Sequence, residues 1–367
     1  MRYCKHTQWL GFAIQDGEVY LQGTDRLHTL VEDLPDPDSQ SPSLFVFIGN
    51  RAKSLAVKEL AKSFSPPPRD GLDPGCMHDE STPNVRPDLS GRRAHGEIHL
   101  HVHTSSTFTS RPVLLAEGDI PIHERQRRPL VSEKCHELTS RLLHHGNGTS
   151  SLADHADKLY FRLLAPFSDV FCFFAADLGG LRPIVERLAV WLDLGRPSNL
   201  SKATRPSILI VTEQGQAEEA TLSEFKQMLT EETTIDASEQ FSDVQVLGLL
   251  PRGKISSKGR HRTLKEALLN ASDRVRAARS TSRSLFSARD FSAFFDYASD
   301  HLAATSSEPF DFILTSRVDN KVSPYLERHL VDFLQRMRSF DQLRQFAIPV
   351  IASSILLDSY TPNLHSK

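Results

Sequence analysis

Short apolar runs alternate with amphipathic stretches along most of the chain, and this alternation constrains the fold more than any other feature. Strands are predicted where the runs are β-branched or aromatic in part, over 44–48, 97–103, 112–116, 170–175, 207–212 and 244–249. Helices are predicted in the gaps, over 54–63, 132–145, 181–194 and 222–231. Such alternation is typical of an α/β fold with a doubly wound, mostly parallel sheet.

The two ends of the chain depart from this alternation. The turn Gln15-Asp16-Gly17-Glu18 joins two short apolar runs, which predicts an N-terminal hairpin over 1–30. An Asp- and Pro-rich linker is expected over 31–43, followed by an α/β domain over 44–260. Within that domain, breaker residues over 65–96 predict a long flexible loop.

A C-terminal helical extension is expected over 261–367. Its helices are predicted over 265–279, 290–305, 324–338 and 341–346. The helix 324–338 is amphipathic, and we expect its apolar face to pack into the core.

Composition narrows the classes of partner and compartment. The 367 residues carry a net charge of −3, which gives no overall electrostatic reason to bind nucleic acid. No apolar run approaches the ~18 residues that a transmembrane helix needs. The 4 cysteines form no C-x-x-C pair, so reduced thiols and a cytoplasmic location are expected.

The segment that follows the strand 44–48 has the order of a phosphate-binding loop. Gly49 and Asn50 form the turn, and Lys53-Ser54 open the next helix, as in the motif G-x-x-x-x-G-K-[ST]. Phe47 and Ala52, however, stand at the two glycine positions of that motif. The sequence therefore predicts a sheet of the phosphate-loop NTPase type whose loop binds GTP or ATP with magnesium weakly or not at all.

Carboxylates follow two of the predicted strands. Glu117 and Asp119 come after 112–116, where a magnesium-facing carboxylate belongs in phosphate-loop NTPases, and Asp177 comes after 170–175. These three residues, with Gly49, Asn50, Lys53 and Ser54, form the candidate nucleotide site. The segment after 207–212 lacks the Asn-Lys-x-Asp motif with which guanine-specific proteins read the base.

The order of several segments resembles the GTPase-like N-terminal region of large fungal patatin-like phospholipases. The similar segments, which span roughly 44–364, are FIGNRAKSLAVKEL, RPVLLAEGDIP, DVFCFFAADLGGLRPIVERLAVWL, PSILIVTE, RTLKEALLNASDRVR, EPFDFILTSRVDN and FAIPVIASSILLDSYTPNLH. The resemblance implies a regulatory or nucleotide-binding module, with a patatin-type lipase as an expected protein partner. It does not imply lipase activity in this chain, since no G-x-S-x-G motif is present.

Two other clusters suggest different chemistry. His99, His101 and His103 alternate along one strand, so their imidazoles share a face and could chelate a metal. The run HLHVHT is similar to the first metal motif of PHP-type phosphoesterases. A basic run over 252–265 stands at a helix start, where it could hold a phosphate or be a solvated loop.

Three hypotheses follow from the sequence. The first is a degenerate phosphate-loop NTPase-like module that acts by contact with another protein or domain. The second is a competent GTP- or ATP-binding NTPase, and the third is a metal-dependent phosphoesterase built on the histidine strand.

Overall fold

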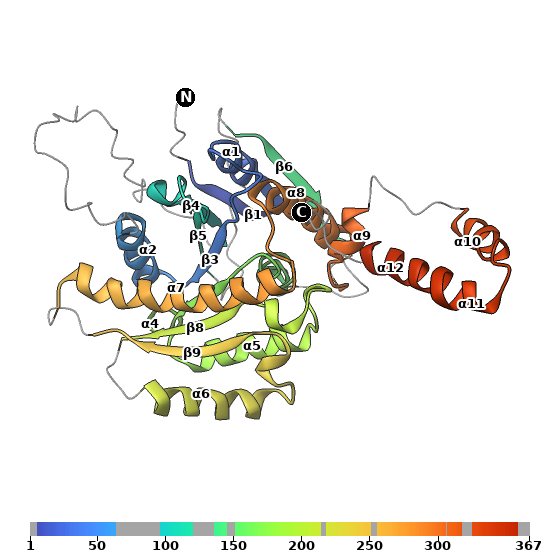
Figure 1. The fold of residues 1–367 in the computed structure, drawn as a ribbon. Coiled ribbons are helices and arrows are strands. Elements are labelled where there is room, and N and C mark those ends of the chain that lie inside the picture. The colour runs from blue at the N-terminus through green and yellow to red at the C-terminus, as the bar shows by residue number, and fades with distance from the viewer. Residues whose placement is uncertain are drawn as a thin grey trace, which may run out of the picture.

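The computed structural model describes residues 6–63, 96–119, 136–144, 151–213, 218–250, 255–305, 307–317 and 325–358. Its centre is a single sheet in the order β6-β2-β1-β4-β5-β3-β7-β8-β9 (Figure 1). The strands are β1 (Gln8–Gln15), β2 (Glu18–Thr24), β3 (Ser43–Ile48), β4 (Ile98–Val102), β5 (Val113–Gly118), β6 (Leu138–Leu142), β7 (Val170–Phe174), β8 (Ser207–Thr212) and β9 (Asp243–Gly248). The predicted loop 65–96 lies outside the described residues except for Gly96.

One half of the sheet is parallel. Strand β3 pairs in parallel with β5 on one side and with β7 on the other, and β8 and β9 continue in the same direction. Every residue of β3, β5 and β7 is buried, which is why these strands read as largely apolar runs rather than alternating ones. The predicted α/β class is confirmed by this half of the sheet.

The other half is antiparallel, so the sheet is mixed. Strand β4 runs antiparallel to β5, and β1, β2 and β6 follow with antiparallel pairing. The N-terminal hairpin is present, with Asp16 and Gly17 at φ 52° and 82° in its turn, and it continues the main sheet through the pairing of β1 with β4. The helix predicted over 132–145 is wrong where the chain is described, because residues 138–142 form β6 along the open edge of β2.

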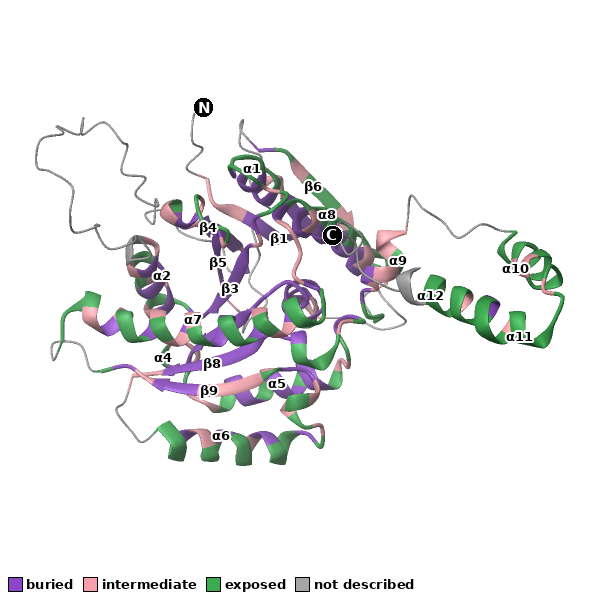
Figure 2. Cartoon of the chain, in the orientation of Figure 1, coloured by how far each residue is buried: buried purple, intermediate pink, exposed green. Residues whose placement is uncertain are grey.

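Helices cover both faces of the sheet (Figure 2). Leu44, Val46 and Ile48 point to one face, where they join the cluster built by α1, α3, η2, α5, α6 and α8. Phe45 and Phe47 point to the opposite face, against α2 and α7. The helices are α1 (Arg26–Glu32), α2 (Arg51–Ser63), α3 (Leu152–Lys158), η2 (Leu159–Leu164), α4 (Ala175–Leu178), α5 (Arg182–Asp193), α6 (Glu218–Glu232), α7 (Ser257–Thr281), α8 (Ala288–Ala304), α9 (Phe312–Ser316), α10 (Leu326–Gln335), α11 (Phe340–Gln342), η5 (Leu343–Ala347) and α12 (Ile348–Asp358), with short turns η1 (Thr104–Ser106), η3 (Lys202–Thr204) and η4 (Ala237–Glu239).

The predicted linker 31–43 is packed rather than extended. Helix α1 occupies its first residues, and Leu34 and Gln40 beyond it are buried. The Gln40 side-chain amide donates to the carbonyls of Thr107 and Thr109, each at 2.6 Å. These contacts attach the segment to the turn before β5.

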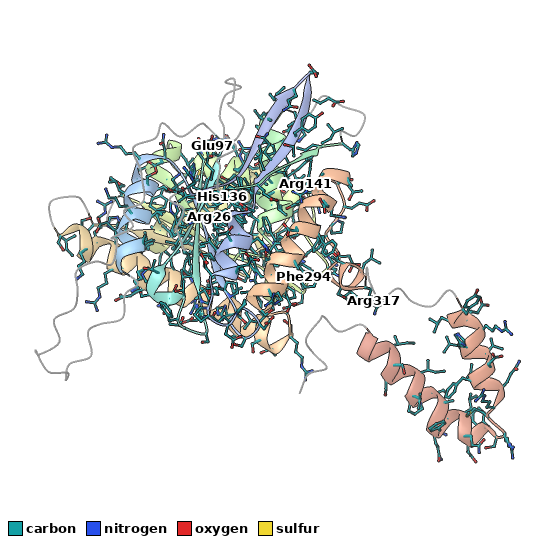
Figure 3. The ribbon with its side chains drawn as sticks, turned by 90° about the horizontal axis from the view of Figure 1, so that it is seen from above. Arg26, Glu97, His136, Arg141, Phe294 and Arg317 are labelled. Carbon is teal, nitrogen blue, oxygen red and sulfur yellow. The ribbon has the colours of Figure 1, made fainter. Side chains whose placement is uncertain are left out.

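The C-terminal helices divide into two groups. Helices α7 and α8 lie against opposite faces of the sheet, whereas α10, α11 and α12 project away from it (Figures 1 and 3). The expected core packing of 324–338 is wrong, since α10 contains no buried residue. The buried clusters on the two sheet faces are built by other helices, among them α5, α8, α2 and α7. Within the described part of the chain, no helix is long and apolar enough to cross a membrane.

Candidate functional site

The predicted loop lies at the carboxyl end of the parallel strands. Gly49 and Asn50 connect β3 directly to α2, which begins at Arg51, three residues earlier than the sequence predicts. Lys53 therefore lies in the first turn of the helix, where backbone N–H groups have no partner within the helix itself. These N–H groups form the feature of the loop that can bind an anion.

The side chain of Asp177 occupies these N–H groups. Its Oδ2 accepts from the amides of Asn50 and Lys53 at 2.7 and 2.9 Å, and its Oδ1 accepts from the amide of Ala52 at 2.8 Å. Asp177 belongs to α4, directly after β7, so neighbouring parallel strands bring it to the loop. A carboxylate of the chain itself thus fills the place that an anionic ligand would take at this helix end.

Gly49 makes this approach possible. Its φ is 154°, and a Cβ built on it would lie 2.8 Å from Asp177 Oδ2 and 3.1 Å from Phe174 Cβ. Both distances are too short for a side chain to fit without movement. The glycine that the sequence assigned to the turn therefore allows Asp177 to reach the loop.

Lys53 points into the protein. Its side chain is 6% exposed, and Nζ donates to the carbonyl of Gly118 at 3.1 Å and lies 3.8 Å from Glu117 Oε2. Glu117 is fully buried and its Oε1 lies 2.9 Å from His101 Nε2. The lysine that the motif assigns to phosphate is therefore part of a buried Lys-Glu-His cluster.

The remaining predicted residues also contact groups of the chain itself. Asp119 accepts from the backbone N–H of Gly96 at 2.5 Å, and its carbonyl accepts from the Tyr160 hydroxyl at 3.1 Å. The amide of Ser54 donates to the carbonyl of Asn50 at 3.0 Å. The structure brings Gly49, Asn50, Lys53 and Asp177 together and places Glu117 behind Lys53.

Of the three predicted metal ligands, His99 and His101 lie on β4 and His103 directly follows it, and the three have different neighbours. His99 Nδ1 lies 3.0 Å from Thr7 Oγ1, and His101 contacts Glu117. His103 is 1% exposed, and burial together with the positive charge of Lys265 lowers its pKa to about 4. Among the residues that the structure describes, no group of three or more His, Cys, Asp or Glu side chains is arranged to hold a metal ion.

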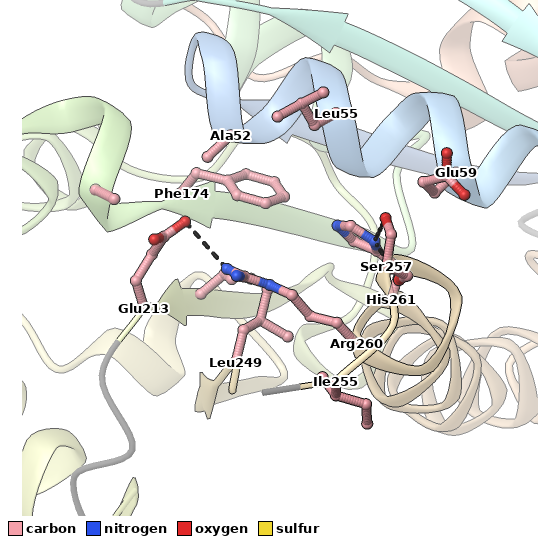
Figure 4. A pocket seen from close by; sticks show the side chains of 12 residues that line it. Ala52, Leu55, Glu59, Phe174, Glu213, Leu249, Ile255, Ser257, Arg260 and His261 are labelled. Atoms are coloured by element: carbon pink, nitrogen blue, oxygen red, sulfur yellow. Dashed lines mark hydrogen bonds and ion pairs between the residues drawn. The ribbon is translucent and has the colours of Figure 1, made fainter. Parts of the chain in front are cut away.

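A cavity of about 250 Å³ lies next to the loop, and the sequence did not indicate it (Figure 4). It opens between α2, the ends of β7 and β8, and the start of α7. Arg260 lines this cavity and belongs to the basic run 252–265. The run was expected to be a solvated loop or to hold a phosphate, but Arg260 is buried. The only sequence signal for Arg260 is its place at the start of a helix, four residues after the N-cap Ser256.

No protein-family model and no curated protein matches the sequence.

Proposed function

We propose that this protein is a phosphate-loop-like α/β module that has lost triphosphate binding and acts by contact with another protein. The observation that carries the proposal is the occupation of the loop amides by the Asp177 carboxylate. A triphosphate would have to displace this carboxylate and also draw Lys53 away from Gly118 and Glu117. The loss of the Asp177 hydrogen bonds and of the Lys53 contacts opposes triphosphate binding.

The position of the loop supports its relation to a nucleotide-binding architecture. The chain leaves β3 toward β5 on one side and later returns to β7 on the other, so the loop after β3 lies where the strand order reverses. In open α/β sheets, ligands bind at this point beyond the carboxyl ends of the strands. A degenerate NTPase-like module would have a loop at such a point whose amides bond to a carboxylate of the same chain.

The projecting C-terminal helices supply a surface for contact. Helix α10 carries apolar and polar residues on different sides and buries none of them. The exposed large apolar side chains of this region are Tyr325, Leu326, Val331, Leu334, Phe340, Phe346, Ile348, Val350 and Ile355. Clustered exposed apolar side chains mark interaction sites, and the resemblance to patatin-associated regions makes a patatin-type lipase domain the proposed partner.

Nucleotide binding can be tested by thermal unfolding. A site with a dissociation constant near ~10 μM would add about 2.7 kcal/mol at ~1 mM ligand and raise the melting temperature by roughly 2–4 °C. We expect a smaller shift for the parent protein with magnesium and GTP or ATP, and the same result for Lys53→Ala. A shift of several degrees that Lys53→Ala abolishes would establish a competent NTPase site instead.

Removing the carboxylate provides the matched test of the loop itself. In Asp177→Ala the amides of Asn50, Ala52 and Lys53 lose their acceptor, so inorganic phosphate should stabilise this variant more than it stabilises the parent protein. Equal effects of phosphate on the two proteins would show that the loop is not an occupied anion site.

A further inference from the structure

Strand β6 is the outermost strand at the antiparallel end of the sheet (Figure 1). Directly after it, Leu143 donates its N–H to the carbonyl of Val19 in β2, at 2.9 Å. In an antiparallel pair, such bonds to the neighbouring strand occur at every second residue. The residues between them therefore direct their N–H and C=O groups away from β2, and in β6 these residues are Leu138, Ser140 and Leu142.

The outer edge of β6 has no strand beside it in the part of the chain that the structure describes. Thr139 and Ser140, at the middle of the strand, are exposed. Edge strands commonly carry a lysine, a proline or a bulge that prevents pairing with another chain. The segment 138–142 has no lysine or proline, its register with β2 is unbroken, and its one charged residue, Arg141, pairs with Asp300 of α8. Another extended strand can therefore add to the sheet here.

The two ends of β6 limit which residues can pair. The N–H of His144 also points away from β2, and it donates to the carbonyl of Ala303 in the last turn of α8, at 3.0 Å. At the other end the chain bends at His136, which is buried and whose Nδ1 lies 2.6 Å from Asp25 Oδ1. An added strand is thereby confined to the five residues 138–142.

The sequence of this segment suits pairing with itself. Antiparallel pairing centred on Ser140 places Leu138 opposite Leu142 of a second copy, and Ser140 opposite the second copy's Ser140. Apolar residues then meet apolar residues, and Arg141 lies opposite Thr139, so no like charges face each other. A register that slides by two residues in either direction would place a leucine opposite one of the blocked ends.

We propose that this protein forms a symmetric dimer in which β6 pairs antiparallel with β6 of a second copy. Three residues of each copy exchange both backbone bonds, which gives six N–H···O=C bonds between the copies. The two-fold axis passes at Ser140, so each edge is used once and the assembly closes as a dimer. The contact uses neither the loop amides nor α10, so it goes beyond the function proposed above.

Charge exchange at Ser140 is the main test, because the two serines face each other across the axis. Ser140→Lys and Ser140→Glu should each weaken the dimer, since like charges then stand opposite each other. Their equimolar mixture should associate about 3- to 30-fold more tightly than either variant alone. Sedimentation equilibrium at roughly 10–500 μM suits an interface this short. Equal dissociation constants for the mixture and the single variants, or a parent protein that stays monomeric, would overturn the proposal.

Proline at the same position tests the backbone bonds. Ser140→Pro removes an N–H that points outward and leaves the bonds to β2, and edge strands tolerate proline at such positions. Each dimer loses two bonds, so the dissociation constant should rise at least about fivefold. Ser140→Ala keeps the N–H and is the matched control, which should leave the dissociation constant unchanged. If Ser140→Pro fails to fold, the charge-exchange pair still decides.

Phe340→Asp separates this contact from the projecting helices. Phe340 is exposed on α11, far along the chain from β6, so this variant should leave the dimer unchanged. A dimer that Phe340→Asp abolishes and Ser140→Pro retains would assign the association to those helices and contradict the proposal.

Discussion

The Asp177 carboxylate lies 2.9 Å from the backbone nitrogen of Lys53, so a side chain at the end of β7 caps the helix that follows β3. Two further amides donate to the same carboxylate. An acidic side chain at a helix N-terminus satisfies unpaired N–H groups and opposes the positive end of the helix dipole. The interaction therefore stabilises the fold and occupies the amides of the loop.

Replacing Asp177 by Ala should destabilise the protein by about 1–3 kcal/mol, because three amides, two of them partly buried, lose a charged acceptor. Urea unfolding of parent and variant measures the difference. Asp38→Ala is the control, since Asp38 forms an exposed ion pair with Arg289 that should contribute little to stability. Equal losses in the two variants would contradict a capping role for Asp177.

Gly49→Ala should destabilise the protein more than Gly195→Ala does. Both glycines have positive φ, but an added Cβ meets nothing within 4 Å at Gly195 and lies 2.8 Å from Asp177 Oδ2 at Gly49. Backbone strain of about 1–3 kcal/mol is expected at each position, and the collision adds to it only at Gly49. Thermal unfolding checks this, and in the Asp177→Ala background the extra loss should diminish because one colliding atom is gone.

His103 should make stability fall as the pH falls from about 6.5 toward 4. Burial lowers its pKa to about 4 in the folded protein, so only the unfolded chain takes up the proton across most of this range. The stabilising contribution is complete above pH 6.5 and is lost on acidification, by at most about 1.4 kcal/mol per pH unit. His103→Gln should flatten the pH dependence of the free energy of unfolding, measured by urea unfolding at several pH values. An unchanged slope in His103→Gln would contradict the assignment.

Asp169 and Arg279 form a buried ion pair that attaches α7 to the sheet. Arg279 Nη1 lies 2.9 Å from Asp169 Oδ1, and its Nη2 donates to the carbonyl of Ser168 at 2.7 Å. Burial lowers the pKa of Arg279, and the negative charge of Asp169 opposes this shift. Asp169→Asn should destabilise the protein by about 3–5 kcal/mol, measured by urea unfolding, because the guanidinium stays buried without its counter-ion. Asp300→Asn at the exposed pair with Arg141 is the matched control and should change stability by less than about 1 kcal/mol.

Phe340→Asp or Phe346→Asp should weaken binding to a purified patatin-type lipase domain from the same organism at least tenfold. Both aromatic side chains are exposed on the projecting helices, and a charge there disrupts apolar contact. Calorimetric titration measures the affinity, with Phe108→Asp as the control, since Phe108 is 82% exposed in the turn before β5. If the parent protein does not bind the lipase domain, the proposed partner is wrong. Self-association that Phe340→Asp abolishes would instead indicate a second copy of the chain as the partner.

Local patterns in the sequence were sufficient for much of the parallel half of the sheet. The apolar runs predicted the ends of β3, β7 and β8 to within one residue, and the 3.6-residue period predicted α5. A strand covered on both faces is largely apolar, so its sequence carries the signal directly. Strand β6 lacks this signal: its residues are partly exposed, and pairing with the free edge of β2 determines its conformation.

The sequence by itself determined the α/β class, the position of the loop after β3 and the two positions, Phe47 and Ala52, at which the glycines of the phosphate-loop motif are missing. Only the tertiary structure decided that Asp177 fills the loop, that Lys53 turns toward Glu117, and that Arg260 lines a cavity. Residue type and spacing report on local conformation, whereas these contacts join residues that are more than 40 positions apart. Which donor meets which acceptor across such separations depends on the order of strands in the sheet, and the periodicity of a single segment contains no information about that order.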